Sequence, residues 1–303
     1  MTEHWRSADF VSAAHAWIDA RLPELGLVRT GEVEQPHVYP WSTVMRVPTG
    51  AGPVWFKANH QPLRHEAALT ALLARRSAGL VPAPLALDQE TGWLLMADAG
   101  DRLRDLAPAD ALGRWHDVLP AYAELQLACE ADVPALLALG VPDRRLPTLA
   151  DSYAALLAEL PGTDARLPGR SRVEELCGEL AAFGVPETVQ HDDLHDAQVF
   201  LRDGHPQVLD WGDACVSHPF FTLSVVLEGV VQWGVDDEPG SEDLAPYVAS
   251  YLAPYRERHA GDLDEAVRLA LRLGWVCRAV NGHLPGDPDA TRTRLRMFLD
   301  GRP

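Results

Sequence analysis

Lysine is almost absent from this 303-residue sequence, and basic residues are outnumbered by acidic ones. The chain has 26 Lys and Arg against 44 Asp and Glu, a formal net charge of −18 at pH 7. The resulting field repels nucleic-acid phosphates and anionic membrane surfaces, so we expect neither as a partner. It would attract a cationic small molecule, but many soluble proteins are acidic for solubility alone. Charge therefore leaves the substrate open.

Three further features are missing, and each argues against a class of protein. The cysteines Cys129, Cys177, Cys215 and Cys277 form no CxxC pair, which argues against a zinc site or a disulfide framework and predicts buried thiols. No apolar run approaches the roughly 18 residues of a membrane span. The opening MTEHWRSADF lacks the basic and apolar segments of a secretory signal. We expect a cytoplasmic protein.

Local patterns predict an N-terminal region that mixes helix and sheet. Residues 9–26 show the apolar spacing of a helix. Residues 42–48 and 52–58 are rich in β-branched and aromatic side chains and are joined by TGAG, which predicts a hairpin. A helix follows over residues 62–79, and a short apolar strand lies within residues 92–100.

The rest of the chain is predominantly helical, as in residues 111–128, 149–160 and 263–280. Because 303 residues exceed the size at which one core usually stops growing, we expect two lobes and an α+β fold. The N-terminal lobe, residues 1–98, would carry a small antiparallel sheet. The larger C-terminal lobe, residues 99–303, would be mainly helical.

Aspartate and histidine crowd into residues 189–214, VQHDDLHDAQVFLRDGHPQVLDWGDA. His191, Asp193 and Gln198 stand in the order H-x-D-x-x-x-x-Q, and Asp210 follows at the end of the expected strand PQVLD. Phosphoryl transfer needs one carboxylate to orient the attacking hydroxyl and accept its proton, and oxygen ligands to hold Mg²⁺ against the nucleotide. Asp193 suits the first task and Asp210 the second. A hairpin between them would bring position 198 close to Asp210, where a cation would offset the crowded charge.

HDDLHDAQ followed by LDWGDA resembles the catalytic and metal-binding segments of the aminoglycoside phosphotransferase and choline-kinase-like family. The usual pattern of that family is H-G-D-L-H-x-x-N followed by I-D-W/F, on a bilobal protein-kinase-like fold, and the resemblance spans most of the chain. It implies that Asp193 is the catalytic base and that Gln198 and Asp210 bind magnesium. It also implies that His191 and His195 support the loop.

The segment departs from the family pattern at two positions, and several of its residues have a second interpretation. Asp192 stands where Gly is usual, and Gln198 stands where Asn is usual. The spacing of His191 and His195 lacks the adjacent Glu of a zinc protease, so we reject zinc. Three aspartates are equally compatible with site roles and with solvated loop charges: Asp192, Asp196 and Asp213.

The interpretation as a kinase requires a lysine on an N-terminal strand and a glutamate on the following helix. Lys57 is the only lysine of the chain and lies on the expected strand GPVWFKA. Glu66 shares a helical face with Leu69 and Leu73, so it points inward, where a carboxylate needs a partner. We expect Lys57 to be that partner; the alternative is a surface lysine and an unrelated helix glutamate.

Other nucleotide contacts are expected from the strand pattern and from the resemblance. Trp55 lies two residues before Lys57, so it shares the same strand face and would stack on adenine, although a core tryptophan fits nearly as well. Ser42 and Thr43, in the PWST turn, occupy the place of the phosphate-covering loop. The turn MADAG resembles the hinge that reads adenine, through Met96, Ala97, Asp98 and Ala99.

The resemblance places the acceptor pocket in the C-terminal helices. Acidic and aromatic candidates there suit an aminoglycoside, an amino sugar or an amino alcohol, although solvation explains the DDE run equally well. The candidates are Asp213, Glu228, Trp233, Asp236, Asp237, Glu238 and Trp275.

We therefore expect a small-molecule kinase that uses ATP or GTP with Mg²⁺ to phosphorylate a hydroxyl. The alternative is a catalytically weak nucleotide-binding pseudokinase or regulatory module. Gln198 favours that alternative, whereas the presence of Lys57, Glu66, Asp193 and Asp210 opposes it.

Overall fold

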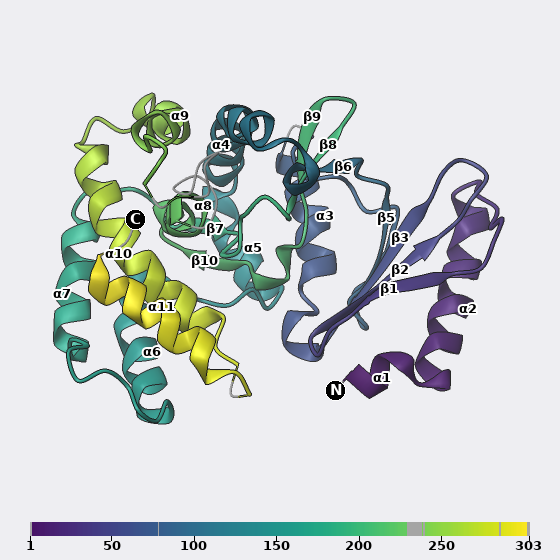
Figure 1. Ribbon diagram of the computed structural model, residues 1–303, viewed down its shortest axis with the longest axis horizontal. Helices are drawn as coiled ribbons and strands as arrows, with labels where there is room; N and C mark the ends of the chain where they lie inside the picture. The colour runs from purple at the N-terminus through teal and green to yellow at the C-terminus, as the bar shows by residue number, and fades with distance from the viewer. Residues whose placement is uncertain (1, 78, 229–237, 239, 285, 302–303) are drawn as a thin grey trace. The chain divides into compact units, whose positions relative to one another are not determined.

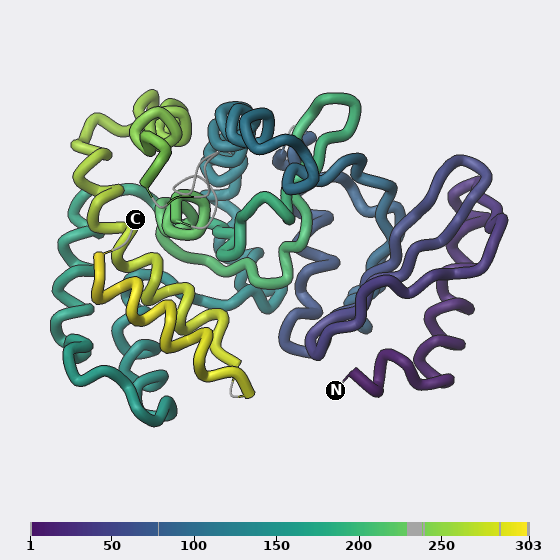
Figure 2. The backbone as a smooth tube through the Cα atoms, viewed as in Figure 1, coloured from purple at the N-terminus to yellow at the C-terminus, as the bar shows by residue number. Residues whose placement is uncertain are grey.

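A computed structural model describes residues 2–77, 79–228, 238, 240–284 and 286–301, which form two compact units (Figures 1 and 2). Unit 1 comprises Met1–Gly100 and Phe200–Gly212, and unit 2 comprises Asp101–Val199 and Asp213–Pro303. The two lobes expected from the sequence, residues 1–98 and 99–303, stay a prediction.

Unit 1 is built around a five-stranded antiparallel sheet, as the β-branched and aromatic segments predicted. Its strands run in the order β1-β2-β3-β5-β4. They are β1 (Glu34–Val38), β2 (Ser42–Val47), β3 (Val54–Asn59), β4 (Ala86–Asp88) and β5 (Trp93–Ala97). The helices of this unit are α1 (Thr2–Arg6), α2 (Ala8–Glu24) and α3 (Glu66–Arg76), and Gln61–Leu63 form a 3₁₀ turn.

Side-chain alternation along the strands gives the sheet two apolar faces. Phe56 and Leu95 belong to a core shared with Phe10 and Ile18 of α2, which lies along the sheet in Figure 1. Leu94 and Met96, the neighbours of Leu95 on β5, pack instead with Ala67 of α3. Successive residues of a strand point to opposite faces, so α2 and α3 cover opposite sides of the sheet.

Residues 199–208 form a β-hairpin of strands β8 (Val199–Arg202) and β9 (His205–Val208). Asp203 and Gly204 have φ of 53° and 80°, the left-handed pair that a two-residue type I′ turn requires. The amide of Val208 donates to the carbonyl of Leu80 at 2.8 Å, which joins the hairpin to the segment after α3. The expected hairpin is present, but its second strand ends at Val208, so Asp210 lies in the turn beyond it.

Unit 2 is mainly helical. Its helices are α4 (Pro108–Ala128), α5 (Val133–Ala138), α6 (Leu146–Glu159), α7 (Arg170–Ala181), α8 (Thr222–Val226), α9 (Ala245–Arg256), α10 (Leu263–Asn281) and α11 (Pro288–Asp300). Its short strands are β6 (Asp101–Arg102), β7 (Thr188–Gln190) and β10 (Cys215–Ser217), and β7 pairs with β10 in antiparallel register. Further 3₁₀ turns of this unit span Leu103–Asp105, Glu130–Asp132 and Pro219–Phe221, and another, Trp211–Asp213, lies where the chain passes from unit 1 to unit 2.

Helix α10 is the central helix of unit 2 and packs against α6, α7, α8 and α11. The side chain of Asp262 caps its first turn by accepting from the amide of Glu265 at 3.1 Å. Gly274 allows a close approach, because a Cβ there would overlap the hydroxyl of Ser224. The buried side of this helix includes Arg278 and borders Asn281 at its end. Close packing of α10 therefore brings two polar side chains into the interior of the unit.

The fold confirms the expected α+β class, with a small antiparallel sheet and many helices. The helix expected from residue 62 begins at Glu66, because the preceding residues form the 3₁₀ turn. All four cysteines belong to the described residues; they are buried, and none forms a disulfide. Among the described helices, none is long and apolar enough to cross a membrane.

Candidate active site

Lys57 projects from β3 on the face opposite the α2 core. Its neighbours Phe56 and Ala58 are fully buried in that core, so the strand pleat turns Lys57 toward α3. The Lys57 ammonium lies 2.7 Å from Glu66 Oε2 and 2.5 Å from Asp210 Oδ1. Burial lowers the pKa of Lys57, but the charges of Asp210 and Glu66 outweigh it and raise the pKa above its usual value. Lys57 is therefore a fixed cation.

Glu66 begins α3 and is almost fully buried, with 3% of its side chain exposed. Burial raises its pKa, and the charge of Lys57 opposes that shift. The amide of Asn59 donates to Oε2, and the backbone amide of Trp211 donates to Oε1 at 3.1 Å. Glu66 thus anchors both Lys57 and the turn that carries Asp210, as the expected Lys57–Glu66 pair requires.

Asp210 lies in the turn after the hairpin, with a φ of 67° that aspartate tolerates better than most residues. About half of its side chain, 49%, is exposed. Gly212 lets this turn approach α3, since a Cβ at position 212 would lie 3.3 Å from Glu66 Oε2. The turn therefore exposes the Asp210 carboxylate to solvent, while Glu66 of α3 holds its backbone through the amide of Trp211.

The other expected nucleotide contacts also lie in unit 1. Trp55 shares the Lys57 face of β3, and its indole N–H donates to Asp98 Oδ2 at 2.8 Å. Asp98 also accepts from the amide of Gly100 at 3.0 Å, which shapes the turn after β5. Met96 and Ala99 are buried, and Ala97 is half-buried.

Ser42 and Thr43 begin β2, directly after the turn at residues 39–41. Thr43 is fully buried, and its hydroxyl donates to the carbonyl of His37 and accepts from Gln35, each at 2.9 Å. A phosphate contact through this hydroxyl would have to replace one of those bonds. Ser42, the first residue of the strand, is also buried.

In unit 2 the loop after β7 carries His191, Asp192 and Asp193. The backbone amide of His191 donates to the hydroxyl of Tyr122 at 2.8 Å, and the amide of Asp193 donates to His191 Nδ1 at 3.3 Å. His191 is fully buried. Both contacts lie at the start of the loop, just before the aspartates.

Asp193 keeps 27% of its side chain exposed. Arg278 donates to its Oδ1 oxygen, and His195 Nε2 lies 3.6 Å from its Oδ2 oxygen. Burial raises the pKa of Asp193, but the hydrogen bond from His195 and the charge of Arg278 together lower it to about 2. The carboxylate is therefore ionised throughout the physiological range.

His195 lies between two carboxylates of the same loop, Asp193 and Asp196. Burial lowers the pKa of its ring, but the hydrogen bonds with Asp193 and Asp196 raise it to about 9. Arg104 also pairs with Asp196 at 2.8 Å, and the amide of Gln198 donates to the carbonyl of His195 at 2.9 Å. Residues 195–198 thus form one hydrogen-bonded turn.

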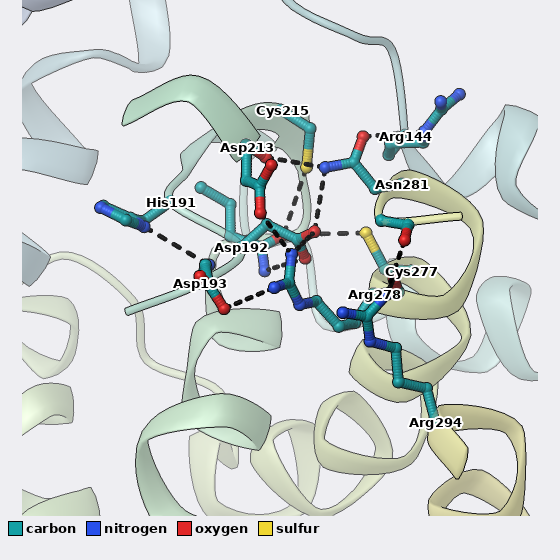
Figure 3. A network of polar contacts seen from close by, with 12 residues as sticks. Arg144, His191, Asp192, Asp193, Asp213, Cys215, Cys277, Arg278, Asn281 and Arg294 are labelled. Carbon is teal, nitrogen blue, oxygen red and sulfur yellow. Dashed lines mark hydrogen bonds and ion pairs between the residues drawn. The ribbon is translucent and has the colours of Figure 1, made fainter. Parts of the chain in front are cut away.

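Arg278 joins three aspartates in the network of Figure 3. One of its terminal nitrogens donates to Asp192 at 3.2 Å and to Asp213 at 3.0 Å, and the other donates to Asp193. Only 8% of the Arg278 side chain is exposed. Burial lowers its pKa, but the three carboxylates raise it above the usual value. The guanidinium therefore stays charged.

Asp192 is completely buried and adopts a φ of 63°. Besides Arg278, it accepts from Asn281 at 2.9 Å and from Gln190 at 3.1 Å. Burial raises its pKa to about 6, against the charge of Arg278 and the bond from Asn281. Asn281 in turn accepts from Arg144 at 3.2 Å. Asp192 is thus built into the interior and is not a solvated loop charge.

Asp192, Cys215 and Cys277 bring three atoms of metal-ligand type within 4.8 Å of one another. Both sulfurs also lie near the side-chain oxygen Oε1 of Gln190, at 3.5 and 3.8 Å. Because all of these groups are buried and already paired, we interpret the cluster as packing beneath the loop.

The acceptor candidates fall into three groups. Asp213 borders Arg278 with 37% of its side chain exposed, whereas Glu228 and Trp275 are buried and Glu238 is exposed. Trp275 precedes Arg278 by three residues on α10, so both side chains share a face of that helix. Trp233, Asp236 and Asp237 lie outside the described residues.

Sequence reasoning missed Arg278, Asn281 and Asn59. Asn59 and Arg278 bond to predicted site carboxylates, and Asn281 bonds to Asp192 and to the backbone carbonyl of Asp213. Arg278 is 85 residues from Asp193 along the chain. One signal was present: Arg278 falls on the apolar side of the helix LDEAVRLALRLGWVCRAVN, where an arginine needs buried carboxylates as partners.

A sequence model described as the phosphotransferase enzyme family matches residues 42–261, well over half of the chain. No curated protein matches. Solved structures with a similar fold include choline kinase LicA from Streptococcus pneumoniae, with 13% identity, a TM-score of 0.62 and 95% and 98% of the two chains covered.

Two further structures show the same fold. A choline/ethanolamine kinase family protein from Mesorhizobium loti has 16% identity and a TM-score of 0.59, with 95% of each chain covered. Macrolide 2′-phosphotransferase MphH from Brachybacterium faecium has 18% identity and a TM-score of 0.56, with 93% of this chain and 98% of that chain covered.

Proposed function

The chain belongs to the phosphotransferase enzyme family and is a small-molecule kinase, and we propose that it uses ATP and Mg²⁺ to phosphorylate a hydroxyl group. The observation that carries this proposal is the ion pairing of Lys57. This lysine contacts Glu66 and also Asp210, which lies 153 residues further along the chain. A largely buried cation held by one carboxylate beside a second, solvent-exposed one is the arrangement that positions nucleotide phosphates in protein kinases.

In the proposed reaction, Asp193 receives the acceptor hydroxyl. The hydroxyl donates to the carboxylate, its oxygen bonds to the terminal phosphorus as the bond to the nucleoside diphosphate breaks, and its proton passes to Asp193. A carboxylate with a pKa of about 2 is a weak base. It therefore acts first by orienting the hydroxyl and accepts the proton late, which suits a loose phosphoryl-transfer transition state.

We propose that Asp210 and Gln198 supply oxygen ligands to Mg²⁺. Carboxylate and amide oxygens are hard donors of the kind that Mg²⁺ prefers, and the half-exposed Asp210 is open to a cation from solvent. Bound Mg²⁺ would neutralise charge on the nucleotide phosphates. Ser42, Thr43, Trp55 and the segment Met96–Ala99 are proposed nucleotide contacts, and GTP remains an alternative donor.

We propose an aminated acceptor, such as an amino sugar or an amino alcohol. Asp213 supports this proposal because it places a partly exposed carboxylate in the same network as Asp193, where an ammonium group would find a partner. The net charge of −18 adds a field of the same sign. Among the structural relatives, one is named a choline kinase and another a macrolide phosphotransferase.

The test combines a nucleotide probe with an acceptor panel. An acyl-phosphate derivative of ATP transfers its acyl group to an amine beside the phosphates, and Lys57 is the only lysine of the chain. We expect labelling at Lys57, protection by excess Mg-ATP, and ATP consumption with an aminated acceptor. In Asp193→Asn, labelling should persist while turnover falls by about 10²–10⁴-fold.

Each outcome has a definite meaning. Labelling without turnover on any aminated sugar, amino alcohol or antibiotic would favour the nucleotide-binding pseudokinase. Neither labelling nor turnover would overturn the proposed function. Competition between ATP and GTP for Lys57 identifies the preferred donor.

A further inference from the structure

The site described above contains a cation that faces the proposed catalytic base. Arg278 donates to Oδ1 of Asp193 from a buried position on α10, and its other terminal nitrogen is bonded to Asp192 and Asp213. An arginine needed only to neutralise the buried Asp192 would direct its paired nitrogens toward that one carboxylate. Here the guanidinium is divided between the buried aspartate and the two partly exposed ones.

We propose that Arg278 is a positioning residue, anchored from below by Asp192, that fixes the carboxylate of Asp193 in the orientation that receives the acceptor hydroxyl. This inference rests on the proposed function, because it assigns Asp193 the role of base. The anchor is rigid: Asp192 is fully buried and is also held by Asn281, which Arg144 holds in turn. A guanidinium held this firmly defines the position of the oxygen to which it donates.

The contacts of Asp193 show what this anchoring achieves. Oδ1 is bonded to Arg278 of α10, and Oδ2 lies 3.6 Å from His195 of the loop that carries Asp193. The carboxylate therefore cannot rotate without losing the bond from Arg278. Displacement of a reacting group by about 1 Å can cost roughly 10²-fold in rate, so this restraint matters for transfer.

Asp192 supplies the second independent observation. A left-handed backbone conformation such as its φ of 63° favours glycine, and burying a carboxylate is costly unless a cation pairs with it. Asp192 has both unfavourable features, and it is the residue next to the proposed base. Its partner Arg278 also contacts Asp193, so the buried ion pair holds the cation that positions the neighbouring carboxylate.

The charges around Asp193 decide how a test must be read. His191 and His195 come from its own loop, Arg278 from α10 and Arg294 from α11, while Asp192 and Asp213 lie beyond Arg278. Removing Arg278 takes away a cation that favours the ionised carboxylate. The pKa of Asp193 must therefore rise in such a variant.

The experiment compares Arg278→Met and Arg278→Lys with the parent. In protein labelled with ¹³C at aspartate carboxyl carbons, the Asp193 signal is identified by its loss in Asp193→Asn. We expect no titration of that signal in the parent above pH 4, and a titration moved upward by about one unit or more in Arg278→Met. Arg278→Lys keeps the positive charge but replaces the planar guanidinium and its several N–H donors with a single ammonium group. The titration of its Asp193 signal should therefore resemble that of the parent.

Activity supplies the second readout. We expect kcat to fall by about 10- to 100-fold in Arg278→Met with the KM for nucleotide unchanged, and the acid limb of the pH profile to move to higher pH. Arg278→Lys should lose part of kcat without moving the acid limb. Asp192→Gly, which suits the backbone and removes the anchor, should also lower kcat.

A matched control is Arg256→Met, which removes an arginine bonded at 2.8 Å to Asp264 near the start of α10. It should change neither the Asp193 signal nor kcat. The inference is overturned if Arg278→Met keeps both the parent's Asp193 titration and its kcat. If Arg278→Met fails to fold, an unchanged kcat in both Arg278→Lys and Asp192→Gly overturns it instead.

The two proposals fail separately. A parent that transfers phosphate to no acceptor contradicts the proposed function, and the carboxyl titration still decides whether Arg278 controls Asp193. An active parent whose Arg278 variants behave normally contradicts only the positioning role. Thermal unfolding of every variant separates both results from a loss of folding.

Discussion

At the scale of single residues, each unit sets one largely buried cation among carboxylates. Lys57 holds Glu66 and Asp210 in unit 1, while Arg278 holds Asp192, Asp193 and Asp213 in unit 2. Both cations are largely buried, so removing either would leave buried charge without a partner. Such losses typically cost about 3–5 kcal/mol, which is why conservative variants are needed to separate function from folding.

His195 gives a prediction about pH. Its folded pKa of about 9 lies above the ordinary value, so its interaction with Asp193 and Asp196 stabilises the fold fully below about pH 6.5. That stabilisation is lost as the pH rises through 9. The difference in unfolding free energy between the parent and His195→Gln should therefore be largest near pH 5–6 and shrink toward pH 10.

Urea unfolding of both proteins at several pH values measures this difference. We expect about 1–3 kcal/mol at the acidic end of the range. His205→Gln, at the exposed first residue of strand β9, is the control and should show a small difference at every pH. A constant difference between the parent and His195→Gln from pH 6 to 10 would contradict the assignment.

Gln198 gives a prediction about the metal. Its amide oxygen is a hard ligand like that of Asn, but the longer side chain has one more rotatable bond. That bond must be fixed when the oxygen binds Mg²⁺, because the ion requires strict octahedral geometry. We expect Gln198→Asn to preserve or raise kcat and lower the Mg²⁺ requirement, and Gln198→Ala to raise that requirement without abolishing turnover. Rates over a Mg²⁺ series at saturating nucleotide test this; three superimposed curves would mean that Gln198 is not a ligand.

At the scale of elements, the hairpin of residues 200–212 depends on a close approach to Gly100. This glycine has a φ of 85°, and a Cβ there would overlap the carbonyl oxygen of Leu201. Gly100→Ala should therefore destabilise the protein by more than the roughly 1–2 kcal/mol of backbone strain alone. Because the same hairpin leads to Asp210, the variant should also weaken Mg-ATP binding.

Gly204→Ala is the matched control for this prediction. Gly204 has a φ of 80° in the hairpin turn, but nothing lies within 4 Å of a Cβ placed there. It should cost only the strain, roughly 1–2 kcal/mol. Chemical denaturation compares the two variants, and equal losses would show that the contact with Leu201 does not matter.

Helix α10 shows how an element can be predicted while its role is not. The pattern of residues 263–280 predicts a helix, and the structure confirms one over Leu263–Asn281. The pattern also places Arg278 on the buried side. Nothing within the helix indicates which carboxylates meet that arginine, because they belong to a loop and a turn far away in the sequence.

At the scale of the whole molecule, the net charge of −18 should influence substrate capture. An aminated acceptor is attracted by this field, and salt screens the attraction over about 8–10 Å at physiological ionic strength. We expect kcat/KM for a cationic acceptor to fall as NaCl rises from about 0.02 to 0.5 M. For an uncharged acceptor it should change little, and an equal salt response for both would argue against capture by charge.

The local sequence determined most elements and much of the site of this protein. The helix and strand patterns, the Asp-Gly turn at residues 203–204 and the short separation of Lys57 from Glu66 all depend on residues close in the chain. Interactions between near neighbours survive in any fold that keeps the element, so periodicity and spacing are enough to predict them.

Tertiary structure alone decided the remainder. It returned residues 200–212 to unit 1, buried Asp192 and brought Arg278 to Asp193 across 85 positions of sequence. A buried charge must find an opposite charge, but the sequence does not say which one, because the partner depends on how distant helices and loops pack. Asp192, Asp193 and Asp213 look alike in the sequence. They differ in burial because each meets Arg278 of α10 from a different position.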